Sequence, residues 1–571
     1  MKASDAIAKF LIAHRIQTCF ELVGGMITHL LDSFAESGQF TIVSMHHEQS
    51  AAFAAEGVAR HTKGKTIALA MGTSGPGATN LITGIGSCWF DSVPCLFITG
   101  QVNTRELKGD RAIRQQGFQE LDIVEVARSL TKYAVRVDSP DDLLPELHRA
   151  LSISLSGRQG PVLLDIPNDV QRAEIPDVLV EKWLNMPLEI STGPEIGMND
   201  LKNLEALCKD AQRPLICIGG GARWADSMDE WLLAADSLGI PYVSTLMGHE
   251  RVIARNNYFN MIGSYGNREA NWAVQNCDLL IVVGARLDVR QTGSDVEDFA
   301  RKAHIVQIDI APSQLGNRVQ AELNICATAE SFFRAFPLRS VAFPNLDKNW
   351  LIELSNQRDW TQLNEYADWE ISPSAIFKKL NRILADHPVD YICDVGNHQM
   401  WAAQSLRLSP DQAVHYSGGM GAMGFALPAA LGIAFQSQSK AVVITGDGSL
   451  QINIQELDTL NRLALDITII VMNNAVLGMV KNFQDMYFNG RDQSTRKGYS
   501  SPSFTQIALA YGIESYRVTN MEELDCALSK ITSHKGPLLI EIMMEGATEC
   551  RPRLAFGSKL DEQFPPMKVH A

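Results

Sequence analysis

The chain has 571 residues, enough for about three to four domains, and its net charge of −15 argues against nucleic-acid binding, which normally needs a basic surface. No apolar run reaches the roughly 18–20 residues that a helix needs to cross a membrane, so we expect no membrane partner. The ten cysteines form no CxxC pair and no cluster with histidine at metal-binding spacing, which favours reduced thiols and a cytoplasmic location.

The N-terminal stretch MKASDAIAKFLIAHRI, residues 1–16, predicts an amphipathic helix, because it lacks the small-residue cleavage site of a signal peptide. Beyond it, short apolar runs alternate with helical patterns along the whole chain. These runs lie at residues 66–72, 95–100, 161–167, 214–220, 279–285, 441–446, 467–473 and 537–543. Continuous apolar strands separated by helices indicate parallel sheets that are covered on both faces.

Polar, proline-containing stretches at residues 172–200 and 337–372 separate three strand-rich blocks. We therefore predict an α/β protein with three doubly wound parallel-sheet domains, at residues 1–180, 190–340 and 365–571. No short-period repeat and no low-complexity tract interrupts this pattern.

One apolar run ends on a carboxylate held between two glycines, Gly446-Asp447-Gly448. Asn473-Asn474 follows after 24 residues that contain a helical segment and another strand, so both motifs should end neighbouring strands of one sheet. A carboxylate and an amide oxygen there, beside glycines that let backbone approach closely, suit Mg²⁺ bound to a diphosphate. The helix after Gly448 would point its N-terminus at the phosphates. A GDG turn alone is common, but the pair of motifs is far more specific.

Further motifs lie along the rest of the chain. They are HHEQSAAFAAEGVAR (46–60), GTSGPGATNLITGI (72–85), FITGQV (97–102), GFQELD (117–122), GPVLLDIPNDVQ (160–171), DLLIVVGARLDVRQTG (278–293), DVGNHQMWAA (394–403), GGMGAMGFALPAALG (418–432) and NNAVLGMVKNF (473–483). Together they resemble the thiamine-diphosphate enzymes, and within them the acetohydroxyacid-synthase-like flavoproteins. The resemblance implies pyrimidine-binding, FAD-type middle and diphosphate-binding domains, in that order. It also implies that Asp447, Asn474 and the backbone carbonyl of Val476 bind Mg²⁺.

In this family, carbon 2 of the cofactor must lose a proton, which requires a carboxyl group against the pyrimidine ring. Glu48 resembles that glutamate; the alternative is an ordinary first-turn helix acid. Met423 matches the bulky residue that bends the cofactor, although a lone methionine is usually a core residue. The resemblance implies further cofactor contacts at Gly25, Val395, Gly396, His398, Gly421, Gly446, Gly448, Ser449 and Met479.

The middle block carries a glycine run after a strand, CIGGGARWA (217–225), which alone is a weak signal. With VVGARLDVRQTG (282–293) and MIGSYGNREAN (261–271), it resembles the FAD-binding domain of the family. By that resemblance the FAD contacts would be Gly219, Gly220, Gly221, Gly263 and Arg290. Ser264-Tyr265 replaces the usual Met-His of the family.

The acceptor side departs from the family pattern. Phe118 and Gln119 match residues near the donor and acceptor, but Asn168 stands where the synthases usually carry Lys, and Phe483 where they usually carry Trp. Phe483 has an alternative role as a core aromatic at helical spacing from Met479. These departures argue against a housekeeping branched-chain synthase.

The stretch NTRELKGDRAIRQQG, residues 103–117, carries four cations and leads into Phe118. A charge run is usually a solvated face, but cations beside an active site suit a phosphate-bearing substrate. The pattern resembles the carboligases of nucleotide-deoxysugar pathways, as in yersiniose formation. By that resemblance, with Arg111 and Arg114 as acceptor contacts, we favour transfer of a two-carbon unit from pyruvate to a nucleotide-activated ketosugar, which would give a branched sugar with a tertiary alcohol. The alternative is an acetolactate synthase that joins two pyruvates, or pyruvate and 2-oxobutyrate. A pyruvate oxidase and an inactive homologue fit less well.

In the family, the cofactor lies between the first block of one subunit and the third block of another. The resemblance therefore implies a homodimer or homotetramer in which Glu48 and Asp447 act from different chains. Expected small-molecule partners are pyruvate and a carbonyl acceptor.

Overall fold

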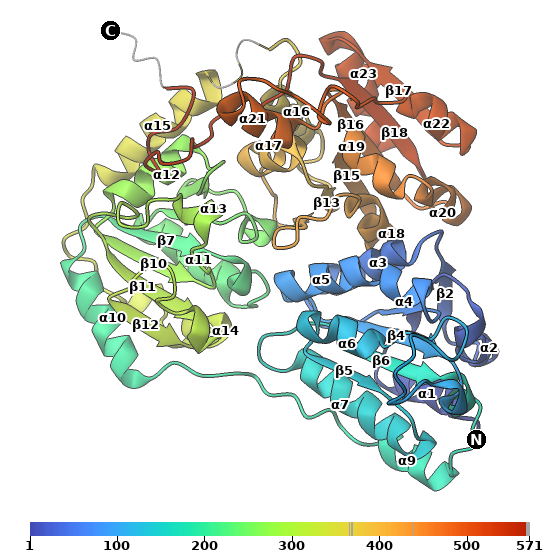
Figure 1. The fold of residues 1–571 in the computed structure, drawn as a ribbon. Helices are drawn as coiled ribbons and strands as arrows, with labels where there is room; N and C mark the ends of the chain where they lie inside the picture. The colour runs from blue at the N-terminus through green and yellow to red at the C-terminus, as the bar shows by residue number, and fades with distance from the viewer. Residues whose placement is uncertain (365, 367–368, 438, 567–571) are drawn as a thin grey trace.

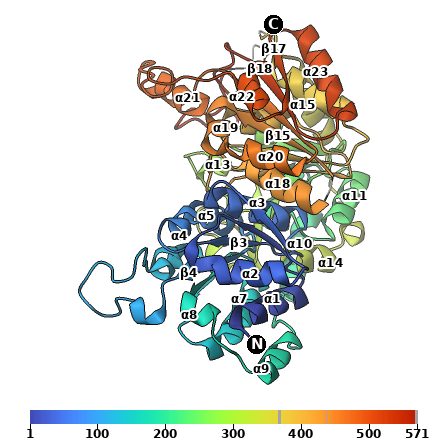
Figure 2. The same cartoon turned by 90° about the vertical axis from the view of Figure 1, so that its right-hand side faces the viewer.

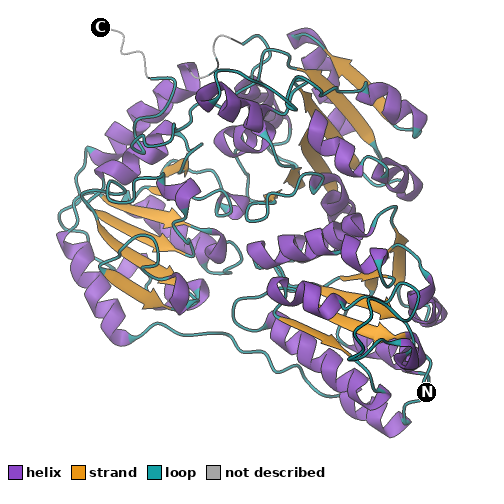
Figure 3. Cartoon of the chain, in the orientation of Figure 1, coloured by secondary structure: helices purple, strands orange, loops and turns teal. Residues whose placement is uncertain are grey.

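The computed structural model describes residues 1–364, 366, 369–437 and 439–566. Three lobes, each with a six-stranded parallel sheet and helices on both faces, confirm the predicted fold class (Figures 1 and 3). The predicted start of the third domain at 365 and its last residues, 567–571, lie outside the described residues. Within the described part of the chain, no helix is both long and apolar enough to span a bilayer.

The N-terminal lobe has strand order β2-β1-β3-β4-β6-β5. Its strands are β1 (Thr18–Glu21), β2 (Thr41–Ser44), β3 (Leu69–Gly72), β4 (Leu96–Gln101), β5 (Tyr133–Arg136) and β6 (Val162–Pro167). Its helices are α1 (Ala3–Ala13), α2 (Thr28–Glu36), α3 (Glu48–His61), α4 (Pro76–Asn80), α5 (Ile82–Asp91), α6 (Ile123–Ala127), α7 (Leu143–Leu155), α8 (Asn168–Gln171) and α9 (Asp177–Leu184). The first of these, α1, is the helix predicted at the N-terminus.

The middle lobe has strand order β12-β11-β10-β7-β8-β9, the order of dinucleotide-binding sheets. Its strands are β7 (Pro214–Ile218), β8 (Tyr242–Ser244), β9 (Tyr258–Met261), β10 (Leu279–Val283), β11 (His304–Asp309) and β12 (Leu323–Cys326). Its helices are α10 (Met198–Asp210), α11 (Met228–Leu238), α12 (Arg268–Asn276), α13 (Val289–Thr292), α14 (Ala329–Ala335) and α15 (Trp350–Asn364). The polar stretch at 337–372 is thus partly the helix α15, whose buried Trp350 donates its indole N–H to the Pro214 carbonyl at 3.1 Å.

The C-terminal lobe has strand order β14-β13-β15-β16-β18-β17, which repeats the order of the N-terminal lobe. Its strands are β13 (Val389–Cys393), β14 (Gln412–Tyr416), β15 (Lys440–Gly446), β16 (Ile467–Asn473), β17 (Glu514–Val518) and β18 (Leu538–Met543). Its helices are α16 (Pro373–Ile383), α17 (Asn397–Ser405), α18 (Ala426–Ser437), α19 (Asp447–Leu450), α20 (Glu456–Leu463), α21 (Gly478–Tyr487), α22 (Phe504–Ala510) and α23 (Met521–Ser533).

Helices α3 and α18 join the N-terminal and C-terminal lobes (Figure 1). Their backbones approach closely at two glycines: a Cβ on Gly432 would stand 2.0 Å from the Ala54 carbonyl oxygen, and one on Gly57 would stand 2.2 Å from that of Ala429. Only glycine fits at such distances. This contact matters for the site because α3 begins at Glu48 and α18 directly follows the turn that carries Met423.

Candidate active site

The carboxyl ends of β15 and β16 bring together the two motifs that the sequence paired. The strands are parallel neighbours, with Gly446 opposite Met472, so Asp447 and Asn474 leave the same edge of the sheet. Both side chains are buried, with Asp447 only 2% exposed, and Val476 is buried beside them. The predicted juxtaposition of a carboxylate and an amide at adjacent strand ends is therefore present.

Each of these polar side chains has a fixed orientation. Tyr499 donates its phenol O–H to Asp447 Oδ2 at 2.7 Å, and burial raises the pKa of Asp447 to about 6. Asn474 donates through Nδ2 to the Ala547 carbonyl at 2.8 Å, which turns Oδ1 toward the backbone N–H of Val476 at 3.3 Å. Each of these oxygens keeps capacity to accept a further bond or a cation.

These groups suit Mg²⁺ only together with a ligand that supplies oxygens. Among the described residues, no group of three or more His, Cys, Asp or Glu side chains gathers as a metal site. One carboxylate, one amide oxygen and one carbonyl leave most of an octahedral shell open, as Mg²⁺ bound to phosphates requires.

The turn after β13 forms another wall of the candidate site, next to α19. Gly396 has φ +154°, and Ser449 donates its hydroxyl to the Val395 carbonyl at 2.7 Å, which joins this turn to α19. The next side chain, Asn397, has both polar atoms buried without a hydrogen-bond partner, and so has His398 at Nε2. Buried polar atoms are normally satisfied, so these atoms are best explained by a bound polar group. Burial lowers the pKa of His398 to about 3, so it faces that group as a neutral ring.

Asp394, which the sequence did not single out, fixes the Met423 turn. Its carboxylate accepts the backbone N–H groups of Val395, Gly424 and Ala426 at 2.8–3.1 Å. Burial nevertheless raises the pKa of Asp394 to about 6. A buried acid at a strand end, directly before the Val395-Gly396 turn, is the signal by which it could have been found.

Met423 itself is half-buried and lies against the GDG turn: a Cβ on Gly448 would stand 3.4 Å from its Cε and 2.5 Å from Leu477 Cδ2. Gly421 has φ +66° and open space at its Cβ position. The predicted residues Gly421, Met423 and Gly448 therefore line the same region as Asp447. Met479, on the first turn of α21, is also half-buried there.

Glu48 is the first residue of α3 and is 5% exposed. Its Oε2 accepts from Asn80 Nδ2 at 2.9 Å, and a Cβ on Gly77 would come within 3.2 Å of its Oε1. A carboxylate at a helix N-terminus is favoured by the dipole, but such acids are usually exposed. The burial of Glu48 thus sets it apart from an ordinary first-turn acid.

Asn453 links this helix to the Met423 turn. Its Nδ2 donates to Gln49 Oε1 at 3.2 Å and to the Gly424 carbonyl at 2.8 Å. No hydrogen bond joins Glu48 to Asp447 directly within the described residues.

Gly25 and Gln119 lie on the loops of the N-terminal lobe. Gly25 opens the 3-10 helix Gly25–Ile27 and has no atom near its Cβ position. Gln119 has φ +65° and is half-buried; a Cβ on Gly75, just before α4, would lie 3.0 Å from its Cβ.

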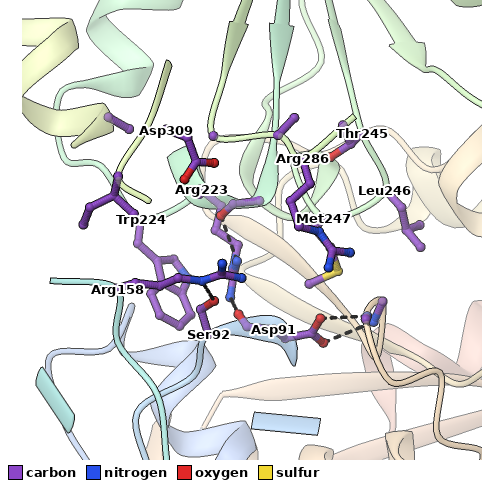
Figure 4. Close-up of a pocket in the computed structure, with 18 of the residues that line it drawn as sticks. Asp91, Ser92, Arg158, Arg223, Trp224, Thr245, Leu246, Met247, Arg286 and Asp309 are labelled. Atoms are coloured by element: carbon purple, nitrogen blue, oxygen red, sulfur yellow. Dashed lines mark hydrogen bonds between the residues drawn. The ribbon is translucent and has the colours of Figure 1, made fainter. Parts of the chain in front are cut away.

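A second feature is a cavity of about 420 Å³ at the crevice between β7 and β10, where the strand order of the middle lobe reverses (Figure 4). The predicted residues Gly220, Gly221 and Arg290 line it. Gly219 and Gly263 instead hold backbones together: their Cβ atoms would lie 2.2 Å from the Gly284 carbonyl and 2.3 Å from the Arg290 carbonyl.

Sequence reasoning missed most of the charged side chains of this cavity. Arg158, from the N-terminal lobe, donates to Ser92 at 2.8 Å, and Arg286 and Asp309 of the middle lobe line the same cavity (Figure 4). Arg223 stacks on Trp224 at 4.2 Å. Glycine-lined backbone and four arginines (Arg158, Arg223, Arg286 and Arg290) suit a dinucleotide, whose phosphates need cations.

Three family models match the chain in order: the N-terminal TPP binding domain of thiamine pyrophosphate enzymes at residues 1–126, their central domain at 201–336 and their C-terminal TPP binding domain at 394–542. The chain belongs to the thiamine pyrophosphate enzymes. Thiamine pyrophosphate and thiamine diphosphate are one compound, so membership confirms the predicted cofactor, and the match to the C-terminal model covers Asp447 and Asn474.

Several relatives resemble this thiamine pyrophosphate enzyme over nearly its full length. The acetolactate synthase large subunit of Cyanidium caldarium is 33% identical over 97% of this chain and 94% of its own. The isozyme 2 large subunit of acetolactate synthase from Escherichia coli (strain K12) is 33% identical over 99% of both chains. A probable acetolactate synthase large subunit of Methanocaldococcus jannaschii is 32% identical over 100% of this chain and 96% of its own. These relatives confirm the acetohydroxyacid-synthase-like group and an enzyme that transfers a two-carbon unit.

The residues predicted to contact the acceptor lie on the outside of this enzyme. Phe118 is 78% exposed and Phe483 is 52% exposed, so Phe483 is not a core aromatic. Within α21 its ring contacts that of Tyr487 in a tilted arrangement, with ring centroids 4.7 Å apart. Asn168 opens α8 and is half-buried. The cationic stretch 103–117, called the basic loop below, projects from the N-terminal lobe beyond β4 (Figure 2).

Arg111 and Arg114 of this loop are exposed. Arg111 donates to the backbone carbonyls of Leu107 and Lys108, so its guanidinium folds back on its own loop. Glu120 accepts three backbone N–H groups of the same loop, so hydrogen bonds within the loop hold its conformation.

Proposed function

We propose that this enzyme decarboxylates pyruvate and joins the remaining two-carbon unit to a second 2-oxo acid, either pyruvate or 2-oxobutyrate. The observation that carries the proposal is the buried pair Asp447 and Asn474 at adjacent strand ends, in a chain similar to acetolactate synthases along nearly its whole length. The nucleotide-activated ketosugar that the sequence favoured as acceptor receives no support from these relatives. The guanidinium of Arg111 bonds to its own loop, which weakens the case that it contacts a phosphate of such a sugar.

Mg²⁺ would be held by Asp447, Asn474 Oδ1 and the Val476 carbonyl, with the remaining ligands from the diphosphate. Thiamine diphosphate, when bound, supplies the carbon nucleophile that attacks the carbonyl of pyruvate. Glu48 would supply the carboxyl group against the pyrimidine ring, because it is buried at the start of α3 and Asn80 holds its Oε2. Met423 would support the cofactor from the turn that Asp394 fixes.

FAD is the proposed occupant of the middle-lobe cavity. Its support is the strand order of the sheet, the glycines that line the crevice, and the arginines Arg158 and Arg286 that enter from two lobes. The proposed reaction gives this flavin no redox step.

A homodimer or homotetramer would place the cofactor between the N-terminal lobe of one subunit and the C-terminal lobe of another. Its support is the exposure of large apolar side chains on the two surfaces that would meet: Phe118, Val480, Phe483, Met486 and Tyr487. Four of these side chains share one helix, α21, and exposed apolar groups that gather in this way usually mark an interface or a substrate site.

The test is a product assay with purified enzyme, thiamine diphosphate, Mg²⁺ and FAD. Pyruvate alone should yield acetolactate, and added 2-oxobutyrate should yield the mixed product, while Asp447→Asn should yield neither. Carbon–carbon bond formation only when a nucleotide ketosugar is present would refute the proposal. Oxygen uptake coupled to pyruvate consumption would instead indicate a pyruvate oxidase.

A further inference from the structure

Tyr499 lies in the segment between α21 and α22, which crosses over the GDG turn. It is half-buried, while its neighbours Arg496, Lys497, Gly498 and Ser500 are exposed, so this one side chain turns inward. Its phenol donates to Asp447 Oδ2 at 2.7 Å, and a Cβ on Gly448 would stand 3.3 Å from the phenol oxygen. The phenol therefore closes one side of the proposed cation site.

Contacts on both sides of Tyr499 fix its place. Before it, Thr495 accepts the Leu477 N–H through its carbonyl at 3.1 Å and donates its hydroxyl to Gln484 of α21 at 2.5 Å. After it, Ser501 donates to the side chain of Asn473 at 3.3 Å. The segment is thus held to α21 and to the end of β16, the same elements that flank Val476 and Asn474.

We propose that Tyr499 is a positioning residue for the cation site: by occupying Oδ2 of Asp447, its phenol fixes the carboxylate so that Oδ1 faces the metal. The inference rests on the proposed function, which makes Asp447 a metal ligand. A carboxylate with one oxygen bonded to a fixed donor loses rotational freedom and enters the metal shell through the other oxygen. Hydrogen-bond partners of metal ligands commonly change metal affinity by about 10–100-fold.

The contact also joins the cation site to α21. Helix α21 carries Met479, expected near the cofactor, and Phe483, expected near the acceptor, and it is linked to Asp447 through Thr495 and Tyr499. The contact spans 52 positions of sequence, so no local motif encodes it.

The experiment measures Mn²⁺ binding, which does not depend on turnover. Enzyme stripped of metal is supplied with saturating thiamine diphosphate and titrated with Mn²⁺, and free Mn²⁺ is counted by electron paramagnetic resonance. Tyr499→Phe keeps the ring and removes the hydroxyl; its Kd should rise by about 10–100-fold. The matched control is Tyr516→Phe, because Tyr516 on β17 donates its phenol to the Glu514 carboxylate and does not touch Asp447. Its Kd should stay at the wild-type value.

The melting temperature of the metal-free protein separates positioning from folding. It should show that Tyr499→Phe stays folded at the temperature of the titration, because the phenyl ring fills the same space and only one hydrogen bond is lost. A Kd for Tyr499→Phe equal to or lower than that of wild type overturns the inference. The phenol would then have no effect on metal binding, or it would compete with the metal for the Asp447 carboxylate. Asp447→Asn keeps the two proposals apart: if it too binds Mn²⁺ like wild type, the assignment of Asp447 as a ligand fails. If only Asp447→Asn loses binding, the role of Tyr499 alone fails.

Discussion

Gly432→Ala is the sharpest test of how the two catalytic lobes are held together. The new Cβ would stand 2.0 Å from the Ala54 carbonyl oxygen of α3, and the obstacle is backbone that cannot rotate away. Because contacts under 3.0 Å are essentially never seen for a Cβ, α3 and α18 must separate by about an ångström or more. In an unobstructed helix the same change would stabilise by about 1 kcal/mol, since alanine is the better helix former. Overpacking costs about 1–3 kcal/mol, and a clash with backbone lies at the upper end; about 3 kcal/mol less the helix gain of about 1 leaves a net loss of about 2 kcal/mol.

The assay is thermal unfolding combined with steady-state kinetics. Gly432→Ala should lower the melting temperature by about 4 °C or more. It should also lower kcat by about 10–100-fold, because α3 carries Glu48 and α18 follows the Met423 turn, and a displacement of about 1 Å misplaces both. Gly546→Ala is the control, since no atom lies within 4 Å of its Cβ position and its φ is not positive. A Gly432→Ala variant that melts at or above the wild-type temperature would refute the reasoning.

Three further outcomes are expected. Glu48→Gln should keep the fold but slow hydrogen exchange at carbon 2 of the bound cofactor, and kcat with it, by about 10²–10⁴-fold; exchange at the wild-type rate would show that Glu48 moves no proton. The double variant Arg111→Ala, Arg114→Ala should convert 2-oxo acids like wild type, because both side chains are exposed. A loss of activity only with a nucleotide ketosugar would instead favour that sugar as the acceptor. Asp165 lies on β6 opposite Thr99 of β4, where burial raises its carboxyl pKa from 3.8 to about 7 even though Gln101 and Thr99 hydrogen-bond to it. Because the folded state binds this proton more tightly, the stability it contributes is full below about pH 4 and is lost as the pH rises to about 7. The melting temperature of wild type relative to Asp165→Asn should therefore fall across that range, and a constant difference would contradict the assignment.

Local sequence determined the strands and the motifs at their ends. The run at 441–446 became β15 and the run at 467–473 became β16, because strands buried on both faces must be apolar throughout. The helical connection between them, α19 and α20, returns the chain to a parallel neighbouring strand, and so Asp447 and Asn474 emerge at the same edge. This pair could be placed from the sequence for that reason.

Only the tertiary structure decided the contacts between distant segments. The sequence did not predict that Tyr499 would bond to Asp447, that Asp394 would hold the Met423 turn, or that Arg158 would enter a cavity of another lobe. Each contact joins segments whose distance along the chain carries no periodic signal, and each depends on how whole lobes pack. The exposure of Phe483 follows from the same cause: helical spacing says which residues share a face, but the packing of α21 decides which face is buried.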